Sequence, residues 1–183
     1  KDKCIGCASC IKRCPTEAIR IRNGKACVIY DKCIACGECV RICPSNAKIP
    51  SYDKFDIVNN YKYKVALIAP SFYGQFDDIK DINYILTAFR NIGFDFVYEV
   101  GIGAELVSQV TQRLFADDKL KKPIISTACP AVLELVSQRF ENLLGNLLPL
   151  LAPVDVAAKL AREKVAKRGV AEEDIGVFFI SPC

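Results

Sequence analysis

A small α+β domain followed by an α/β domain with a mostly parallel sheet is the fold class that the sequence predicts. Residues 1–50 contain nine of the eleven cysteines, and eight of these repeat in a fixed spacing. From residue 64 onward, short apolar runs alternate with patterns of helical period. Alternating strands and helices are typical of a parallel sheet covered by helices. Residues 51–63 show neither pattern, which predicts a linker between the two domains.

Two copies of one cysteine motif define the first domain. Each copy reads C-x2-C-x2-C-x3-C-P, and the second copy begins 29 residues after the first. This motif binds 4Fe–4S clusters, and its fourth cysteine ligates the cluster of the other copy. We therefore predict an α+β two-cluster ferredoxin-like domain with two crossed ligand sets. The first set is Cys4, Cys7, Cys10 and Cys43, and the second set is Cys33, Cys36, Cys39 and Cys14.

Structural zinc and disulfides are the alternatives for so many cysteines. Zinc sites more often combine short cysteine hooks with histidine, and the chain has no histidine. Disulfide scaffolds are typical of short secreted chains, whereas no segment here resembles a signal peptide. Cys27 lies outside the ligand spacing and is interpreted as a small buried apolar residue.

Turns and a hairpin are expected to connect the ligands. Gly6 and Gly37 allow tight turns that a Cβ would obstruct. Between the two motifs, isoleucine alternates with arginine over residues 19–22, and Asn23-Gly24 is typical of a type I′ turn. The second strand is expected over Ala26–Tyr30, which completes a small β-hairpin.

Composition and charge exclude several classes of function. Hydrophobic residues make up 51% of the 183, enough for a packed core. The net charge of +4 is too small to indicate nucleic-acid binding, and no apolar run approaches the ~18 residues of a membrane span. Cluster cysteines require a reducing compartment, so we expect a cytoplasmic protein. Because Lys1 lies three residues before a ligand and the chain stops on Cys183, we expect a piece of a longer protein.

The second domain, residues 64–183, is predicted to consist of β-α units. Its strands are expected over the short apolar runs Val65–Ala69, Phe94–Val100, Ile124–Thr127 and Ile175–Ile180. Its helices are expected over 78–92 after an Asp77 cap and before Gly93, over Ala104–Phe115, over Pro130–Phe140, and over Pro153–Arg168 before Gly169. Gly101 and Gly103 are assigned to a turn, since a nucleotide-binding fingerprint would need a third glycine in place of Leu106.

Two cysteines of the second domain follow the carboxyl ends of predicted strands. In open α/β sheets ligands bind at that edge, and Cys129 would also lie at the N-terminus of the helix that begins at Pro130, which suits an anionic group. On spacing alone, Cys129 and Cys183 are either two isolated buried cysteines, which is the commoner case, or two cluster ligands.

Several segments together resemble the FeFe-hydrogenases, and this resemblance covers nearly the whole chain. They are Ala69-Pro70-Ser71, Gly103-Ala104-Glu105-Leu106, Ser126-Thr127-Ala128-Cys129-Pro130 and Ser181-Pro182-Cys183. The resemblance implies that residues 64–183 form the first lobe of the domain that holds the H-cluster, a 4Fe–4S cube bridged to a di-iron site. In that family, T-S-C-C-P and M-P-C each supply one cysteine to the cube, and Cys129 and Cys183 match those ligands. A redox partner such as a ferredoxin, and a signalling domain beyond the C-terminus, are also implied.

The departures from the family pattern concern ligands and proton transfer. The family's last motif, E-x-x-x-C-x-x-G-C, supplies two more cube ligands and does not occur before the chain ends, so we expect the H-cluster in the full-length protein but not in this fragment. Ala128 stands where the family has its proton-transfer cysteine, and an ungapped match puts Leu148 at a relay serine. Neither side chain can carry a proton. Such departures resemble the sensory FeFe-hydrogenases.

Three functions are compatible with these observations. The first is hydrogen sensing or slow reversible hydrogen oxidation and proton reduction, with electrons relayed by two 4Fe–4S clusters. The second is an ordinary hydrogenase with a different proton route. The third is a ferredoxin-like electron-transfer module whose α/β lobe docks a partner protein.

Overall fold

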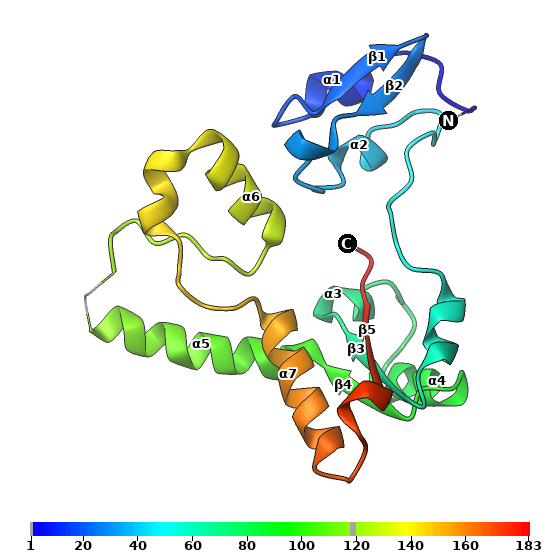
Figure 1. Ribbon diagram of the computed structural model, residues 1–183, viewed down its shortest axis with the longest axis vertical. Helices are drawn as coiled ribbons and strands as arrows, with labels where there is room; N and C mark the ends of the chain where they lie inside the picture. Colours follow the sequence, from blue (N-terminus) through cyan, green and yellow to red (C-terminus); the bar gives the residue numbers. More distant parts are fainter. Residues whose placement is uncertain (1, 118–119) are drawn as a thin grey trace. The chain divides into compact units, whose positions relative to one another are not determined.

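The computed structural model describes residues 2–117 and 120–183 and divides into two compact units. Lys1–Tyr52 and Lys121–Leu148 form one unit, here called the cluster unit. Asp53–Leu120 and Pro149–Cys183 form the other, here called the sheet unit (Figure 1). Residues 121–148 thus group with the cysteine motifs although they lie far from them in the sequence. No helix among the described residues combines the length and the hydrophobicity needed to cross a membrane.

The first part of the cluster unit is a small α+β arrangement, as predicted. Its elements are α1 (Ser9–Arg13), β1 (Ile19–Arg22), β2 (Lys25–Val28), η1 (Tyr30–Lys32) and α2 (Glu38–Arg41). The two strands pair antiparallel, with Ile19 opposite Val28. Asn23 and Gly24 have φ of 50° and 71°, and two positive φ values are what a type I′ turn requires. The second strand ends at Val28 instead of Tyr30, because Tyr30 begins η1.

The predicted strand over Ile124–Thr127 is wrong. Only Ile125 forms a bridge, to Leu147 of the same unit, with backbone hydrogen bonds of 2.8 Å from Ile125 N to Asn146 O and from Leu148 N to Ile125 O. The ladder does not continue, and the Leu148 carbonyl, which its next bond would use, accepts the Thr127 hydroxyl at 3.0 Å. The buried Asn146 side chain also takes up carbonyls that precede Ile125, donating to Pro123 O at 2.7 Å.

The segment Lys121–Leu148 also contains α6 (Pro130–Arg139) and η3 (Glu141–Asn146). The helix begins at the proline that the sequence indicated and ends one residue before Phe140. Proline suits this first position because the N–H that it lacks would have no partner within the helix.

The sheet unit contains the parallel sheet that the sequence predicts. Its strands are β3 (Tyr63–Ile68), β4 (Phe96–Glu99) and β5 (Ile175–Ile180), in the order β4-β3-β5. Both neighbours of β3 run parallel to it, with Val65 opposite Phe96 and Val177. The central strand is buried from Val65 to Ile68, which matches an unbroken apolar run instead of an alternating one.

Helices cover both faces of this sheet. Side chains of β3 alternate between the faces, so Val65 and Leu67 pack on α7 (Pro153–Ala166), whereas Ala66 and Ile68 pack on α4 (Asn83–Asn91). Figure 1 shows α7 on one side of the strands, and α4 with η2 (Phe55–Asn60) on the other. The predicted linker therefore contains one helical segment, and its Val58 is buried in the second core.

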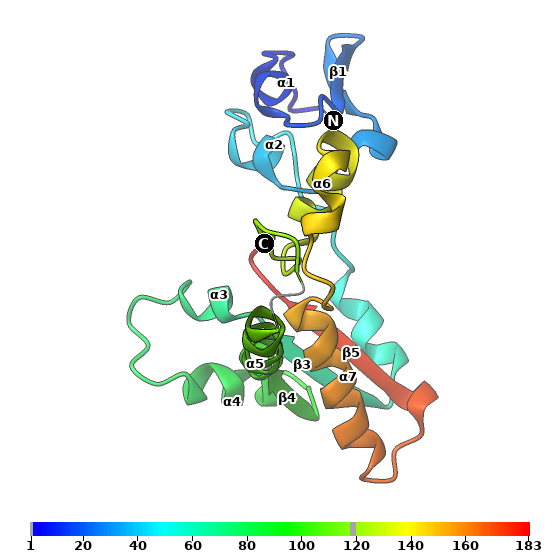
Figure 2. The ribbon, with the colours of Figure 1, turned by 90° about the vertical axis from the view of Figure 1, so that its left-hand side faces the viewer.

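Gly103 serves helix packing, and its assignment to a turn is wrong. The helix α5 (Val100–Ala116) begins before both glycines, and it crosses α7, beside which it is seen end-on in Figure 2. A Cβ on Gly103 would lie 2.4 Å from Pro153 O and 2.9 Å from Ala157 N. The crossing therefore admits no side chain at this position.

The remaining connections are short. The segment α3 (Pro70–Tyr73) follows β3, and η4 (Glu172–Asp174) precedes β5. The predicted Asp77 cap is wrong: α4 begins at Asn83, whose backbone N–H donates to Asp81 Oδ1 at 2.9 Å. Asp81 lies two residues before the helix, where a short acceptor side chain can serve the first unpaired N–H groups.

Candidate metal centre

The structure brings together the four cysteines of the first predicted ligand set. Cys4, Cys7, Cys10 and Cys43 line one cavity of the cluster unit, with Ala26 and Lys48 also at its wall. Cys43 comes from the second motif, so the cavity combines three cysteines of one copy with the fourth of the other. Among the described residues, no group of Cys, Asp and Glu side chains converges tightly enough to hold a single metal ion. The four sulfurs instead surround a space between them.

The two cysteine loops have the same backbone conformation, position by position. Left-handed φ values occur at three pairs of residues related by the 29-residue offset. The pairs are Gly6 (70°) with Ala35 (52°), Ala8 (62°) with Gly37 (77°), and Glu17 (54°) with Asn46 (47°). The sequence indicated only the two glycines, because alanine rarely adopts this conformation. Turns of this kind aim successive N–H groups into a concave site that suits an anion.

The fourth cysteine of each motif accepts an equivalent backbone hydrogen bond. Ala18 N donates to Cys14 Sγ and Ala47 N donates to Cys43 Sγ, each at 3.2 Å. The Ala47 N–H and the Ser45 hydroxyl lower the pKa of Cys43 to about 7. Since iron binds the thiolate form, these donors favour the state in which Cys43 can be a ligand.

The other thiols of the cavity differ in their surroundings. The Ala26 N–H, 3.4 Å from Cys4 Sγ, lowers the pKa of that thiol, and the Ser9 hydroxyl lowers the pKa of Cys7. Burial raises the pKa of Cys10, and the positive charge of Lys48 opposes that effect. Lys48 is held at the wall by donating to Ala26 O at 3.2 Å.

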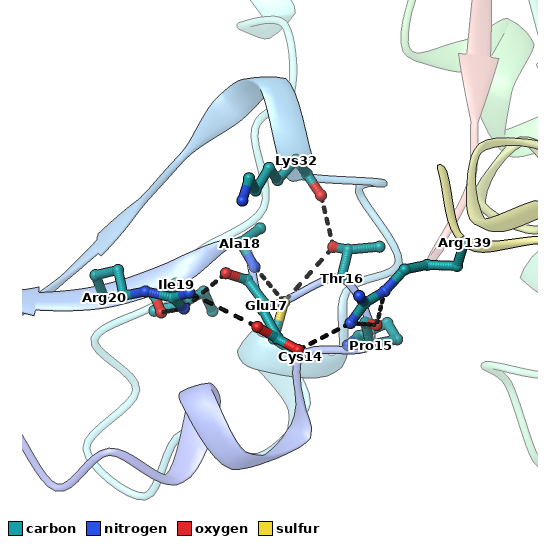
Figure 3. Close-up of polar contacts among 9 residues, drawn as sticks. All are labelled: Cys14, Pro15, Thr16, Glu17, Ala18, Ile19, Arg20, Lys32 and Arg139. Atoms are coloured by element: carbon teal, nitrogen blue, oxygen red, sulfur yellow. Dashed lines mark hydrogen bonds and ion pairs between the residues drawn. The ribbon is translucent and has the colours of Figure 1, made fainter. Parts of the chain in front are cut away.

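In the second predicted set, a hydrogen bond from Thr16 connects the loop of Cys14 to the loop of Cys33. Thr16 Oγ1 lies 3.8 Å from Cys14 Sγ and donates to Lys32 O at 2.5 Å (Figure 3). This bond ties the loop of Cys14 to the residue that precedes Cys33. Burial raises the pKa of Cys39, and the nearby thiols of Cys33 and Cys36 raise it further, while Lys48 lowers it. Lys48 therefore acts electrostatically on one thiol of each set.

The donors fit iron–sulfur clusters. All eight are thiols, and the loops offer backbone N–H groups to the sulfurs. Such donors stabilise an anionic cluster and set its reduction potential. Cys27 is half-buried in β2, where its thiol lies 3.9 Å from Lys25 O, and it does not line the cavity.

Cys129 and Cys183 lie in different units and are both exposed. Cys129 directly precedes α6, and Cys183 follows β5 at the carboxyl edge of the sheet. The alternative that both are buried in a core is therefore wrong, and so is the prediction that Cys129 follows a strand of the sheet. Ala128 is exposed, whereas Leu148 is buried and its carbonyl accepts the Thr127 hydroxyl at 3.0 Å.

Comparison with protein-family models identifies both parts of the chain. The model described as "Iron only hydrogenase large subunit, C-terminal domain" matches residues 62–183, two thirds of the chain. The chain belongs to the iron-only hydrogenase family. The model described as "4Fe-4S dicluster domain" matches residues 1–44. This hydrogenase chain therefore joins an iron–sulfur electron-transfer domain to a hydrogenase-like domain, as its motifs predicted.

Sequence reasoning missed three residues that lie near the predicted cluster ligands. Lys48, Thr16 and Arg139 lie outside the ligand motifs, and nothing in their own spacing distinguishes them from surface residues. Lys48 bonds the Ala26 carbonyl, Thr16 bonds the Lys32 carbonyl, and Arg139 contacts the loop that follows Cys14. Only tertiary contacts show their relation to the cysteines.

Proposed function

We propose that this chain is the cluster domain and the first hydrogenase lobe of a sensory-type iron-only hydrogenase. The full-length protein would bind hydrogen and interconvert it slowly with protons and electrons. The observation that carries the electron-transfer part is the cavity lined by Cys4, Cys7, Cys10 and Cys43. The crossing of the motifs at this cavity supports one 4Fe–4S cluster here and a second one at Cys33, Cys36, Cys39 and Cys14.

The residues of the cluster unit would hold the clusters and set their properties. Eight thiolates bind iron, and N–H groups such as those of Ala18 and Ala47 stabilise negative charge on sulfur. When bound, each cluster takes up and releases one electron. The repeated loops thus provide two electron sites within one compact unit, and a redox partner protein such as a ferredoxin would exchange electrons with them.

Cys129 and Cys183 would each supply one ligand to the H-cluster cube of the full-length protein. The match of both residues to the family's cube-ligand motifs supports this role, and both thiols are exposed. We propose that the full-length protein supplies the two further cube ligands and carries a signalling domain. The cysteine chemistry favours a reducing compartment, so we propose the cytoplasm.

The substitutions at the proton route support sensing over fast turnover. Ala128 presents a methyl group and Leu148 an isobutyl group, and neither can hold or pass a proton. A positioned acid or base typically contributes ~10²–10⁴-fold to a rate. The absence of both groups would therefore limit turnover without preventing hydrogen from binding.

Hydrogen evolution by the matured full-length protein tests this proposal. Ala128→Cys alone should raise the rate modestly, because Leu148 still interrupts the path. Ala128→Cys with Leu148→Ser should raise it more than the product of the two single effects, since members of a relay act as a unit. A wild-type rate equal to that of the double variant would contradict the sensory role. The lack of di-iron infrared bands after maturation would instead indicate the electron-transfer module.

One contact favours the second candidate, an ordinary hydrogenase with a different proton route. Tyr73 Oη donates to Glu99 Oε1 at 2.9 Å, and the pKa of Tyr73 is raised by burial and by this carboxylate. Glu99 ends β4 and Tyr73 follows β3, so the pair lies at the carboxyl edge where ligands bind in such sheets. Tyr73→Phe should leave a sensory protein's rate unchanged and should lower the rate of an enzyme that uses this pair.

A further inference from the structure

The helix α6 is attached to the loop of Cys14 by one arginine. Both Nε and Nη2 of Arg139 donate to Pro15 O, at 3.3 Å and 3.2 Å. Nη2 also lies 3.0 Å from Glu17 Oε1 (Figure 3). One planar guanidinium thus contacts a backbone carbonyl and a carboxylate on either side of Thr16. These contacts are here called the Arg139 clamp.

The loop end that receives the clamp is itself held in place. Glu17 has a left-handed φ of 54°, which a glutamate rarely adopts. Its carbonyl accepts a hydrogen bond from Arg20 Nη1 at 2.8 Å, and its N–H donates to Cys14 O at 3.3 Å. The hydrogen bond from Arg139 also lowers the pKa of Glu17, so the carboxylate is charged at neutral pH. The clamp therefore closes on a defined conformation and not on a mobile turn.

The equivalent loop of the second motif has no such attachment. In the described part of the chain, no side chain donates to Pro44 O, and Asn46, at the position of Glu17, has no charged partner. The backbones of the two loops agree, so the clamp is a side-chain feature that distinguishes the Cys14 loop from the Cys43 loop.

The clamp acts through geometry more than through strength. The side chains of Arg139 and Glu17 are 43% and 62% exposed, and ion pairs this open to solvent contribute little on their own. Three donor–acceptor contacts from one rigid fork nevertheless fix the angle at which the helix meets the loop. The main consequence of losing them would be a looser orientation, with stability nearly unchanged.

The position of Arg139 on α6 gives the clamp a functional meaning. The helix has ten residues, about 15 Å at the usual rise, and Cys129 immediately precedes it. We propose that Arg139 is a positioning residue that fixes the spacing between Cys129 and the cluster ligated by Cys14. Electron transfer depends steeply on such spacings. The inference rests on the proposed function, in which Cys14 and Cys129 are both cluster ligands.

The test measures this spacing directly in the 183-residue chain with its two clusters reconstituted. With Cys27→Ser and Cys183→Ser in the background, the exposed Cys129 is the thiol left outside the two ligand sets, and it can carry a nitroxide label. Pulsed dipolar EPR then gives the distribution of distances from the label to the reduced clusters. We expect a narrow distribution in the reference protein and a clearly broader one in Arg139→Gln. Arg139→Lys should be intermediate, since an ammonium cannot serve both acceptors as a planar fork does.

A matched control comes from the other loop. Arg41 makes two 2.8 Å hydrogen bonds to Glu38 within the same unit, and Arg41→Gln removes a surface ion pair without touching the Cys14 loop. Its distance distribution should equal that of the reference protein. Glu17→Gln serves as a second control, because it removes the charge and keeps an acceptor oxygen for Arg139 and the contact with Pro15 O. Its distribution should stay close to that of the reference protein.

Two outcomes would overturn the proposal. The first is an equal width in Arg139→Gln and the reference protein, or in Arg139→Lys and the reference protein should Arg139→Gln fail to fold. The second is equal broadening in Arg139→Gln and Arg41→Gln, which would indicate a general loss of structure. Iron analysis before labelling separates these results from a failure of the proposed function. If the reference protein binds no clusters, the ligand assignment is wrong, and the clamp loses the role proposed for it.

Discussion

The two cysteine loops of the cluster unit have one backbone and two sets of surroundings. Left-handed residues, turn hydrogen bonds and N–H donors to the fourth sulfur recur at the same offset in both. The side chains around them do not recur. Ser9, beside Cys7, corresponds to Glu38, which pairs with Arg41, and Glu17, which accepts Arg139, corresponds to Asn46. A ligand motif thus dictates the loop, while residues outside the motif give each site its own environment.

Replacing the fourth cysteine of either loop should have the largest effect. Cys14→Ser should remove the cluster of Cys33, Cys36 and Cys39, and Cys43→Ser should remove the other one. The reference protein should bind about eight irons and each variant about four. Iron analysis and EPR measure the result.

Cys27→Ser is the control and should keep all eight irons, because its thiol does not line the cavity. Two normal cluster signals in Cys14→Ser would contradict the crossed ligation. A value near twelve irons in the reference protein would show a third cube in this chain.

The two loop glycines should respond differently to alanine. Gly37 has open space at its Cβ position, so Gly37→Ala should cost only the left-handed conformation, about 1–2 kcal/mol. A Cβ on Gly6 would lie 2.6 Å from Gly24 O in the hairpin turn. Gly6→Ala should therefore cost more, because the hairpin must shift. Anaerobic denaturation, monitored by the absorbance of the clusters, measures the stability of both variants. Equal midpoints would show that the hairpin can shift at no cost in stability.

Removing the charge that both sites share should shift both reduction potentials. Lys48 acts on Cys10 of one set and Cys39 of the other. A nearby positive charge favours the reduced, more negative cluster, so Lys48→Gln should lower both potentials. EPR-monitored titration measures them. A shift confined to one cluster would mean that Lys48 belongs to a single site.

The ion pair of the second loop should matter least. Arg41 and Glu38 are bonded bidentately, but Arg41 is largely exposed. Arg41→Gln should change the free energy of unfolding by less than about 1 kcal/mol. A larger loss in the same denaturation measurement would show that this pair supports its loop as closely as the Arg139 clamp is proposed to support the other.

Much of the cluster unit was predictable because its information is local. The cysteine spacing indicates the cluster chemistry, since ligands must follow one another at intervals that wrap a cube. Asn23-Gly24 indicates the hairpin, since few residues accept two positive φ values. The loop alanines escaped prediction for the converse reason: Ala8 and Ala35 adopt a conformation that alanine alone disfavours, and the surrounding turns impose it.

The sequence by itself determined the fold class, the parallel sheet and the bounds of β5, because period and apolar runs depend on neighbouring residues only. Tertiary structure decided the rest. Ile124–Thr127 has the composition of a strand, yet it forms a single bridge, and beyond it the Thr127 hydroxyl bonds the Leu148 carbonyl in place of a backbone N–H. Gly103 resembles a turn residue, yet a crossing helix requires it. Arg139 lies 122 residues from Glu17 in the sequence. No local sequence pattern can predict this contact, because only folding of the chain brings the two residues together.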